Sequence, residues 1–164
     1  MFAPDELITA LADGGVEYIL IGGLAVGAHG FPRATKDLDV VPAPDEANLR
    51  RLAAVLREID ARHFETGDFD PAEFPFDPLK ADDLREGGNF VLATRLGRLD
   101  VMQWVPGVPG DRAFEHLARS AVETSLGTRP VRVCSRADLI AMKQAAGRPQ
   151  DLVDLEELGI DPST

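Results

Sequence analysis

Residues 21–41 read IGGLAVGAHGFPRATKDLDVV, and their pattern predicts the strand–helix–strand unit at the centre of the fold. It continues a β-rich run, VEYIL, that we interpret as a buried strand closed by two glycines. The letters LAVGAHG predict a short helix, FPRAT a loop, and DLDVV a second strand that ends at the prolines of PAP. Since Gly23 lies fourteen residues before Asp37, with only a short helix and a loop between them, the glycine turn is expected beside the second strand.

Two carboxylates on the second strand are the first candidates for chemistry. Asp37 and Asp39 are one residue apart, so both side chains point to the same face of the strand, while Leu38 and Val40 point into the core. Two neighbouring carboxylates repel each other unless a cation lies between them. Oxygen ligands of this kind suit Mg²⁺ or Mn²⁺. The alternative interpretation is a pair of solubilising acids at a strand end.

The glycine pair Gly22 and Gly23 is a candidate anion site. It follows a strand and opens a helix, where free backbone N–H groups favour a phosphate. The alternative is a tight turn that allows close packing of helix on sheet. A phosphate-binding turn next to a pair of metal-binding carboxylates is what a metal–nucleoside triphosphate requires.

The rest of the chain predicts one α+β domain over residues 1–164, with a mixed sheet and two C-terminal helices. We expect helices at 4–13, 45–60 and 111–121, and a hairpin within 89–105 that turns near Arg95–Arg98. A second hairpin turns around Gly127, and the last helices cover 136–146 and 149–158. Residues 61–86, rich in Phe, Pro and Asp, are expected to form either a functional flap or an irregular surface insertion.

Composition excludes several classes of protein. A net charge of -11 opposes binding to bulk nucleic acid. The single Cys134 cannot form an intramolecular disulfide, and its setting in PVRVCS predicts a buried structural thiol. No apolar run approaches the length of a membrane span, and the N-terminus does not resemble a signal peptide. We therefore expect a cytoplasmic protein.

Taken together, Gly22-Gly23, His29-Gly30, Arg33, Thr35, Asp37 and Asp39 resemble the signature of the polymerase-β nucleotidyltransferase superfamily. The sequence looks most similar to bacterial stand-alone proteins related to abortive-infection toxin nucleotidyltransferases. The resemblance implies a mixed sheet flanked by helices, and three carboxylates that hold two divalent metals. It also implies transfer of a nucleoside monophosphate from a triphosphate to an acceptor hydroxyl, with release of pyrophosphate.

The resemblance implies a third carboxylate on a later strand, and Asp100 in GRLDVMQWV fits this role. An acid between Leu99 and Val101 is unfavourable unless it is paired or metal-bound. An exposed position on an edge strand is the alternative. In the expected two-metal mechanism, Asp37 and Asp39 hold both ions, while Asp100 binds one of them and orients or deprotonates the acceptor hydroxyl.

The C-terminal sequence LIAMKQAAGRPQDLVDL also resembles the toxin-like enzymes, in which a lysine and a later aspartate complete the site. Lys143 shares a helical stripe with apolar residues, so it either contacts phosphate or extends along the surface to reach solvent. Asp151 and Asp154 follow the helix break, and either one is a candidate partner of Lys143 or Arg148.

One position departs from the superfamily pattern. Many relatives carry Ser or Thr after the glycine pair, where this chain has Leu24. Phosphate contacts are therefore expected from backbone amides, Arg33, Thr35 or Lys143. His29 and His63 have no acidic partner at a telling spacing, so we interpret both as structural or surface residues.

The resemblance points to tRNA or a protein as the acceptor, with a cognate antitoxin or toxin as partner. Transfer to a small molecule, as in aminoglycoside resistance, is one alternative. A degenerate, non-catalytic binding protein is another; Leu24 favours it, while the retained Asp37, Asp39 and Asp100 oppose it.

Overall fold

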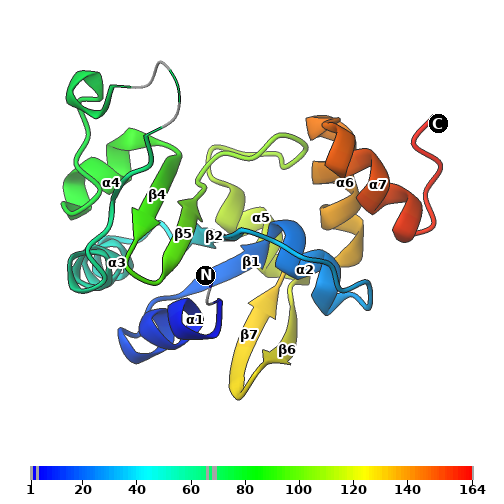
Figure 1. The fold of residues 1–164 in the computed structure, drawn as a ribbon, viewed down its shortest axis with the longest axis horizontal. Helices are drawn as coiled ribbons and strands as arrows, with labels where there is room; N and C mark the ends of the chain where they lie inside the picture. The colour runs from blue at the N-terminus through cyan, green and yellow to red at the C-terminus, as the bar shows by residue number, and fades with distance from the viewer. Residues whose placement is uncertain (1, 3, 66, 68–69, 164) are drawn as a thin grey trace.

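A computed structural model describes residue 2 and residues 4–65, 67 and 70–163. Within them, seven strands form one mixed sheet in the order β3-β4-β5-β2-β1-β7-β6 (Figure 1). β2 pairs in parallel with β5 and antiparallel with β1, and β1 pairs in parallel with β7. The strands are β1 (Tyr18–Ile21), β2 (Asp37–Pro42), β3 (Arg62–His63), β4 (Phe90–Thr94), β5 (Gly97–Val101), β6 (Val122–Leu126) and β7 (Arg129–Val133).

Helices flank this sheet, which confirms the expected α+β class. α1 packs against β2, β5 and β7, and α5 packs against β1 and β2. The helices are α1 (Pro4–Asp13), α2 (Gly22–Ala28), α3 (Glu46–Glu58), α4 (Ala81–Gly87), α5 (Ala113–Ser120), α6 (Arg136–Ala146) and α7 (Pro149–Glu157), with one 3₁₀ turn, η1 (Pro71–Glu73).

The central strands show why the sequence pattern was informative. Along β2, Leu38 and Val40 are fully buried in the core, while Asp37 and Asp39 are only partly buried on the other face. The two expected hairpins form as β4–β5 and β6–β7. β5 lies between β4 and β2, so it is an inner strand of the sheet.

Local chemistry sets the ends of the principal helices. The side chain of Asp45 caps α3 by accepting a hydrogen bond from the Asn48 N–H at 2.9 Å, and Ser135 caps α6 in the same way. α6 ends where Gly147 adopts the left-handed conformation with a φ of 60°. α2 begins at Gly22, two residues before the expected start, because the chain turns directly out of β1 at this glycine.

The segment 61–86 contains more structure than either sequence interpretation predicted. It carries β3, η1 and the start of α4, and its apolar residues Phe74, Phe76 and Leu79 pack against the core. The rings of His63, Phe74 and Phe90 form an aromatic cluster, with the Phe74 and Phe90 ring centroids 5.9 Å apart. Residues 66, 68 and 69 of this segment lie outside the described residues.

The two flanking parts of the fold lie on either side of the acidic strands. In Figure 1, α3 and α4 lie on the left of β5 and β2, and α6 and α7 lie on the right. α6 contacts α2 and α7, so the C-terminal helices pack beside the glycine turn. In the described part of the chain, none of the helices has the length and apolar character needed to cross a bilayer.

Candidate active site

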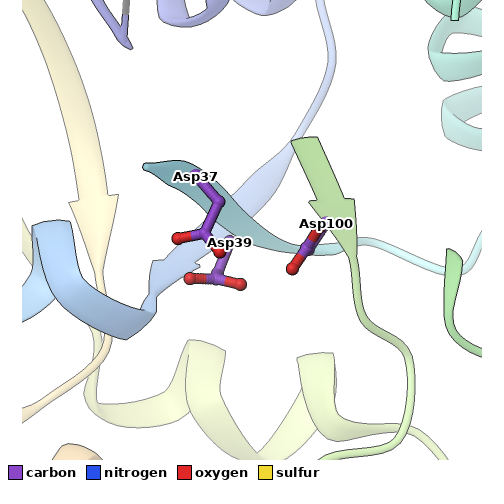
Figure 2. A group of neighbouring side chains, drawn as sticks. All are labelled: Asp37, Asp39 and Asp100. Atoms are coloured by element: carbon purple, nitrogen blue, oxygen red, sulfur yellow. The ribbon is translucent and has the colours of Figure 1, made fainter. Parts of the chain in front are cut away.

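The three candidate carboxylates converge at one point on the sheet (Figure 2). The parallel pairing of β2 and β5 puts Asp100 directly opposite Asp39, and Asp37 lies two residues along the same face of β2. Each of the three offers an oxygen, and these oxygens all lie within 4.8 Å of one another. Asp100 is 6% exposed and stands on an inner strand, so the edge-strand alternative is wrong.

Burial and neighbouring charges change the pKa values of Asp39 and Asp100. Burial, followed by the neighbouring charges of Asp37 and Asp100, raises the pKa of Asp39 to about 7. Burial also raises the pKa of Asp100, although its contacts with Arg98 oppose the shift. Three oxygen donors that repel one another suit a divalent cation, which would relieve that repulsion. The residues therefore fit a Mg²⁺ or Mn²⁺ site.

The raised pKa makes a prediction for the metal-free protein. An unfolded aspartate has a pKa near 4, whereas that of folded Asp39 is about 7, so its ionisation destabilises the fold. The stabilising contribution of the protonated carboxyl is complete below about pH 4 and is lost as the pH rises through 7. We expect Asp39→Asn to raise the melting temperature of the metal-free protein at pH 8 and to leave it unchanged near pH 4.

The matched control is Asp111→Asn, which neutralises an exposed aspartate outside the site. Its melting temperature should follow that of the wild type at both pH values. A melting temperature for Asp39→Asn that equals the wild-type value at pH 8 would show that Asp39 is not held under repulsion.

A cation that the sequence interpretation missed lies among the acids. Arg98 pairs with both oxygens of Asp100, with Nε 3.1 Å from Oδ1 and Nη2 3.1 Å from Oδ2. Its Nε is also 3.8 Å from Oδ2 of Asp37, the residue directly across the β2–β5 ladder. The available signal was the spacing of Arg98 and Asp100, which period 2 places on one face of a strand.

The glycine turn lies against the carboxylates, as the sequence predicted. A Cβ on Gly22 would come within 2.1 Å of Oδ2 of Asp39, and a Cβ on Gly23 within 3.0 Å of the side chains of Arg33 and Thr35. Gly22 also has a φ of 74°. Gly22 must therefore lack a side chain if Asp39 is to keep its position.

Gly22→Ala is expected to destabilise the protein by about 1–3 kcal/mol and to displace the Asp39 carboxylate. Urea unfolding measures the first effect, and loss of Mn²⁺ affinity measures the second. Gly27→Ala is the matched control in the same helix, because a Cβ there meets only Pro32, at 3.6 Å. Equal behaviour of the two variants would contradict the close approach of Gly22 and Asp39.

The loop between α2 and β2 brings two further candidates to the site. The hydroxyl of Thr35 donates to Oδ1 of Asp37 at 3.2 Å, which orients that carboxylate. Nη2 of Arg33 donates a hydrogen bond to Oδ2 of Asp154 at 3.0 Å. Nε of Arg33 lies 2.8 Å from Oδ1 of Asp154 but makes no hydrogen bond to that oxygen. Arg33 thus ties this loop to the C-terminal helix α7.

Lys143 is buried, so the interpretation that it extends along the surface to reach solvent is wrong. Its Nζ lies 3.0 Å from Oδ1 of Asp151 and 2.8 Å from Oδ2 of Asp154, with both carboxylates almost fully buried. Asp151 also accepts from Nε of Arg148 at 2.8 Å. The sequence left open which aspartate pairs with which cation: both pair with Lys143, and Asp151 also pairs with Arg148.

Hydrogen bonds keep both buried aspartates charged. Burial alone would raise the pKa of Asp151, but hydrogen bonds from Arg148 and Lys143 outweigh it and lower that pKa. The pKa of Asp154 is likewise lowered, because hydrogen bonds from Lys143, Arg33 and Gln150 outweigh burial. Three cations and two acids in one cluster leave a net positive charge beside the acidic triad.

One cleft with two parts joins these groups. The polar part, of ≈ 590 Å³, has five cations in its lining: Arg33, Lys36, Arg98, Lys143 and Arg148. The apolar part, of ≈ 460 Å³, has eight apolar residues in its lining: Ile21, Val91, Met102, Val105, Pro106, Leu139, Met142 and Ala146. Asp39 and Asp100 line both parts, so the carboxylates stand where the two meet.

The remaining candidates lie outside this chemistry. Nε2 of His29 is 2.8 Å from the carbonyl oxygen of Cys134, and Nε2 of His63 is 3.0 Å from that of Phe76. Cys134 is fully buried, and burial raises its thiol pKa to about 12, as a structural thiol requires. Leu24 packs partly buried against the core.

Comparison with known proteins shows similarity in structure only. No family model and no curated protein matches the sequence. The solution structure of the antibiotic-resistance factor ANT(2'')-Ia matches 94% of this chain and 79% of its own, with 18% identity and a TM-score of 0.58. A crystal structure of ANT(2'')-Ia in complex with adenylyl-2''-tobramycin matches 95% of this chain and 90% of its own, with 17% identity and a TM-score of 0.54.

A third solved structure extends the comparison to another organism. A Thermotoga maritima protein assigned as a nucleotidyltransferase matches 96% of this chain and 94% of its own, with 16% identity and a TM-score of 0.54. All three matches cover most of both chains, so the sheet and its flanking helices correspond as a whole. The chain therefore has the fold of these nucleotidyltransferases.

Proposed function

We propose that this protein is a divalent-metal-dependent nucleotidyltransferase, which moves a nucleoside monophosphate from a nucleoside triphosphate to an acceptor hydroxyl and releases pyrophosphate. The observation that carries the proposal is the convergence of Asp37, Asp39 and Asp100 at the junction of a cation-lined and an apolar cleft. The fold similarity to ANT(2'')-Ia and to the Thermotoga maritima protein supports it.

The position of each group of residues in the cleft indicates its proposed role. Asp37, Asp39 and Asp100 would hold Mg²⁺ or Mn²⁺, and the ions would neutralise the triphosphate and stabilise the attacking and leaving oxygens. The cations of the polar part would bind the phosphates. Lys36 and Arg148 are exposed there, Arg148 while paired with Asp151, and Arg33 and Lys143 are also paired with acids. This chemistry needs mainly positioning and electrostatic stabilisation.

Gly22, Gly23 and Thr35 shape the polar part of the cleft. Gly22 packs against the Asp39 carboxylate and Gly23 against the side chains of Arg33 and Thr35. Since Leu24 offers no hydroxyl, we propose that the backbone N–H groups of the two glycines contact a phosphate. Thr35 is already hydrogen-bonded to Asp37, so its part is to orient that carboxylate. Asp100 lines the apolar part as well, where we propose that it orients or deprotonates the acceptor hydroxyl.

For the acceptor we propose a hydroxyl group of a tRNA or of a protein, with the enzyme as one member of a toxin–antitoxin pair and the cognate antitoxin or toxin as its partner. The proposed setting is the cytoplasm, which supplies nucleoside triphosphates and keeps a lone thiol such as Cys134 reduced. A small-molecule acceptor is the second candidate, because the similar ANT(2'')-Ia is solved with adenylyl-2''-tobramycin.

Label transfer tests the reaction and identifies the acceptor together. The protein is incubated with Mg²⁺, a cell extract and each nucleoside triphosphate labelled at the α- or the γ-phosphate, with tobramycin added in a parallel series. Transfer of the α-label alone to RNA, protein or tobramycin is the expected result and names the acceptor class. Transfer of the γ-label would indicate a kinase and contradict the proposal.

A further inference from the structure

Arg98 occupies the position of a cation within the acidic triad. On the shared face of β2 and β5, Arg98 is opposite Asp37 and Asp100 is opposite Asp39. The guanidinium binds both oxygens of Asp100 and reaches toward Asp37. It thereby balances the charge of one of the three carboxylates and donates one hydrogen bond to each of its oxygens.

The Arg98 side chain is also held from the other side. Its guanidinium carbon lies 5.0 Å from the centroid of the Phe64 ring, within the range of a cation–π contact. Phe64 follows β3, so the segment after the sheet edge positions this cation. Phe64, Val91 and Arg98 line a small aromatic pocket, and Val91 and Arg98 continue into the main cleft.

A guanidinium pairs equally well with a carboxylate or a phosphate, because both present two oxygens to its planar fork. Arg98 lines the polar part of the cleft, where we place the triphosphate, as well as the apolar part. A phosphate entering the polar part therefore offers Arg98 a second partner within the same cleft. Asp100 would be released when that exchange takes place.

We infer that Arg98 is a positioning residue which withholds Asp100 from the metal site until a nucleoside triphosphate arrives. The inference rests on the proposed function and adds an order of assembly to it. Without nucleotide, Asp37 and Asp39 hold one divalent ion, and Asp100 stays paired with Arg98. With nucleotide, Arg98 pairs with phosphate and Asp100 joins the site, so that a second ion binds.

Counting bound Mn²⁺ by electron paramagnetic resonance of the free ion tests this order. We expect one tightly bound Mn²⁺ per wild-type chain without nucleotide, and two with an α,β-methylene triphosphate analogue, which cannot be cleaved at the reacting bond. Arg98→Gln should bind the second Mn²⁺ without nucleotide at least roughly tenfold more tightly than the wild type does.

Arg95→Gln is the matched control. Arg95 is an exposed cation of the same hairpin, and its side chain contacts the carbonyl oxygen of Glu58 rather than the three carboxylates. It should bind Mn²⁺ as the wild type does. Phe64→Leu keeps the charge of Arg98 but loosens its side chain. It should therefore raise the affinity for the second Mn²⁺ by a smaller factor than Arg98→Gln does. This variant gives the same readout if Arg98→Gln does not fold.

The outcomes separate the two proposals. Equal Mn²⁺ isotherms for the wild type, Arg98→Gln and Phe64→Leu, with binding still strengthened by nucleotide, would overturn the role of Arg98 and leave the proposed function standing. Two equally tight ions in the nucleotide-free wild type would also overturn it. Absence of Mn²⁺ binding by the wild type even with the analogues of all four nucleotides would instead overturn the proposed function.

Discussion

Asp39→Asn is expected to abolish nucleotide transfer, lowering metal-dependent pyrophosphate release by about 10³-fold or more while the fold remains intact. Asp39 is the central member of the triad: it lies across from Asp100, next to Asp37 on β2 and against the backbone of Gly22. An asparagine keeps the size of the side chain but removes one negative charge from the metal ligands. In the proposed site the three carboxylates act as a unit, so losing one should remove most of their combined effect.

The measurement is pyrophosphate release with the acceptor that label transfer identifies, accompanied by circular dichroism of each variant. Asp111→Asn is again the control, because it makes the same chemical change at an exposed position away from the cleft. It should keep the wild-type rate. Wild-type turnover in a folded Asp39→Asn variant would remove the metal-binding role of this residue.

Asp154→Ala is expected to cause the largest loss of stability, about 3–5 kcal/mol. Asp154 is 1% exposed and contacts two cations, Lys143 and Arg33. Its removal leaves Asp151 as the one acid among three cations of the cluster, Lys143, Arg33 and Arg148, and excess buried charge of one sign is strongly destabilising. The same change breaks the link between α7 and the loop before β2, so the cation-lined part of the cleft should loosen as well.

Urea unfolding measures this loss. Glu156→Ala is the matched control, since it removes an exposed acid from the same helix and should change the free energy of unfolding by no more than about 0.5 kcal/mol. Combining Asp154→Ala with Lys143→Met removes both charges and should recover part of the loss. A loss for Asp154→Ala no larger than that of the control would show that the charged cluster is not buried in solution.

The strands and the Asp37–Asp39 pair could be predicted because they depend on local spacing: the two carboxylates are one residue apart on a strand. Asp100 was identified through the family resemblance, because its apolar run alone fits an exposed edge position equally well. The glycine turn followed from the short distance between Gly23 and Asp37 along the chain. Each of these signals lies within about twenty residues and uses the period of a strand or a turn.

The contact of Arg33 with Asp154 could not be predicted, because the two residues are 121 positions apart in the sequence. Nothing in the sequence near Arg33 indicates that it pairs with Asp154, and the apolar stripe around Lys143 fits either a buried or a solvent-reaching lysine. The place of Arg98 in the site could not be predicted, because an arginine near a carboxylate on the same strand usually forms an ion pair at the surface. The packing of 61–86 depends on aromatic contacts such as Phe74 with Phe90, which composition does not reveal.

We propose that Asp37, Asp39 and Asp100 form a metal-dependent nucleotide site. Calorimetry tests whether nucleotide binding depends on the metal, and the acceptor need not be known. Each nucleoside triphosphate is titrated into the wild type with Mg²⁺ and again with a chelator, and then into Asp39→Asn with Mg²⁺. We predict that at least one triphosphate binds the wild type only when Mg²⁺ is present, and that this binding is lost in Asp39→Asn. Absence of binding for all four triphosphates, or binding that neither chelation nor the substitution changes, would contradict a metal-dependent nucleotide site at these carboxylates.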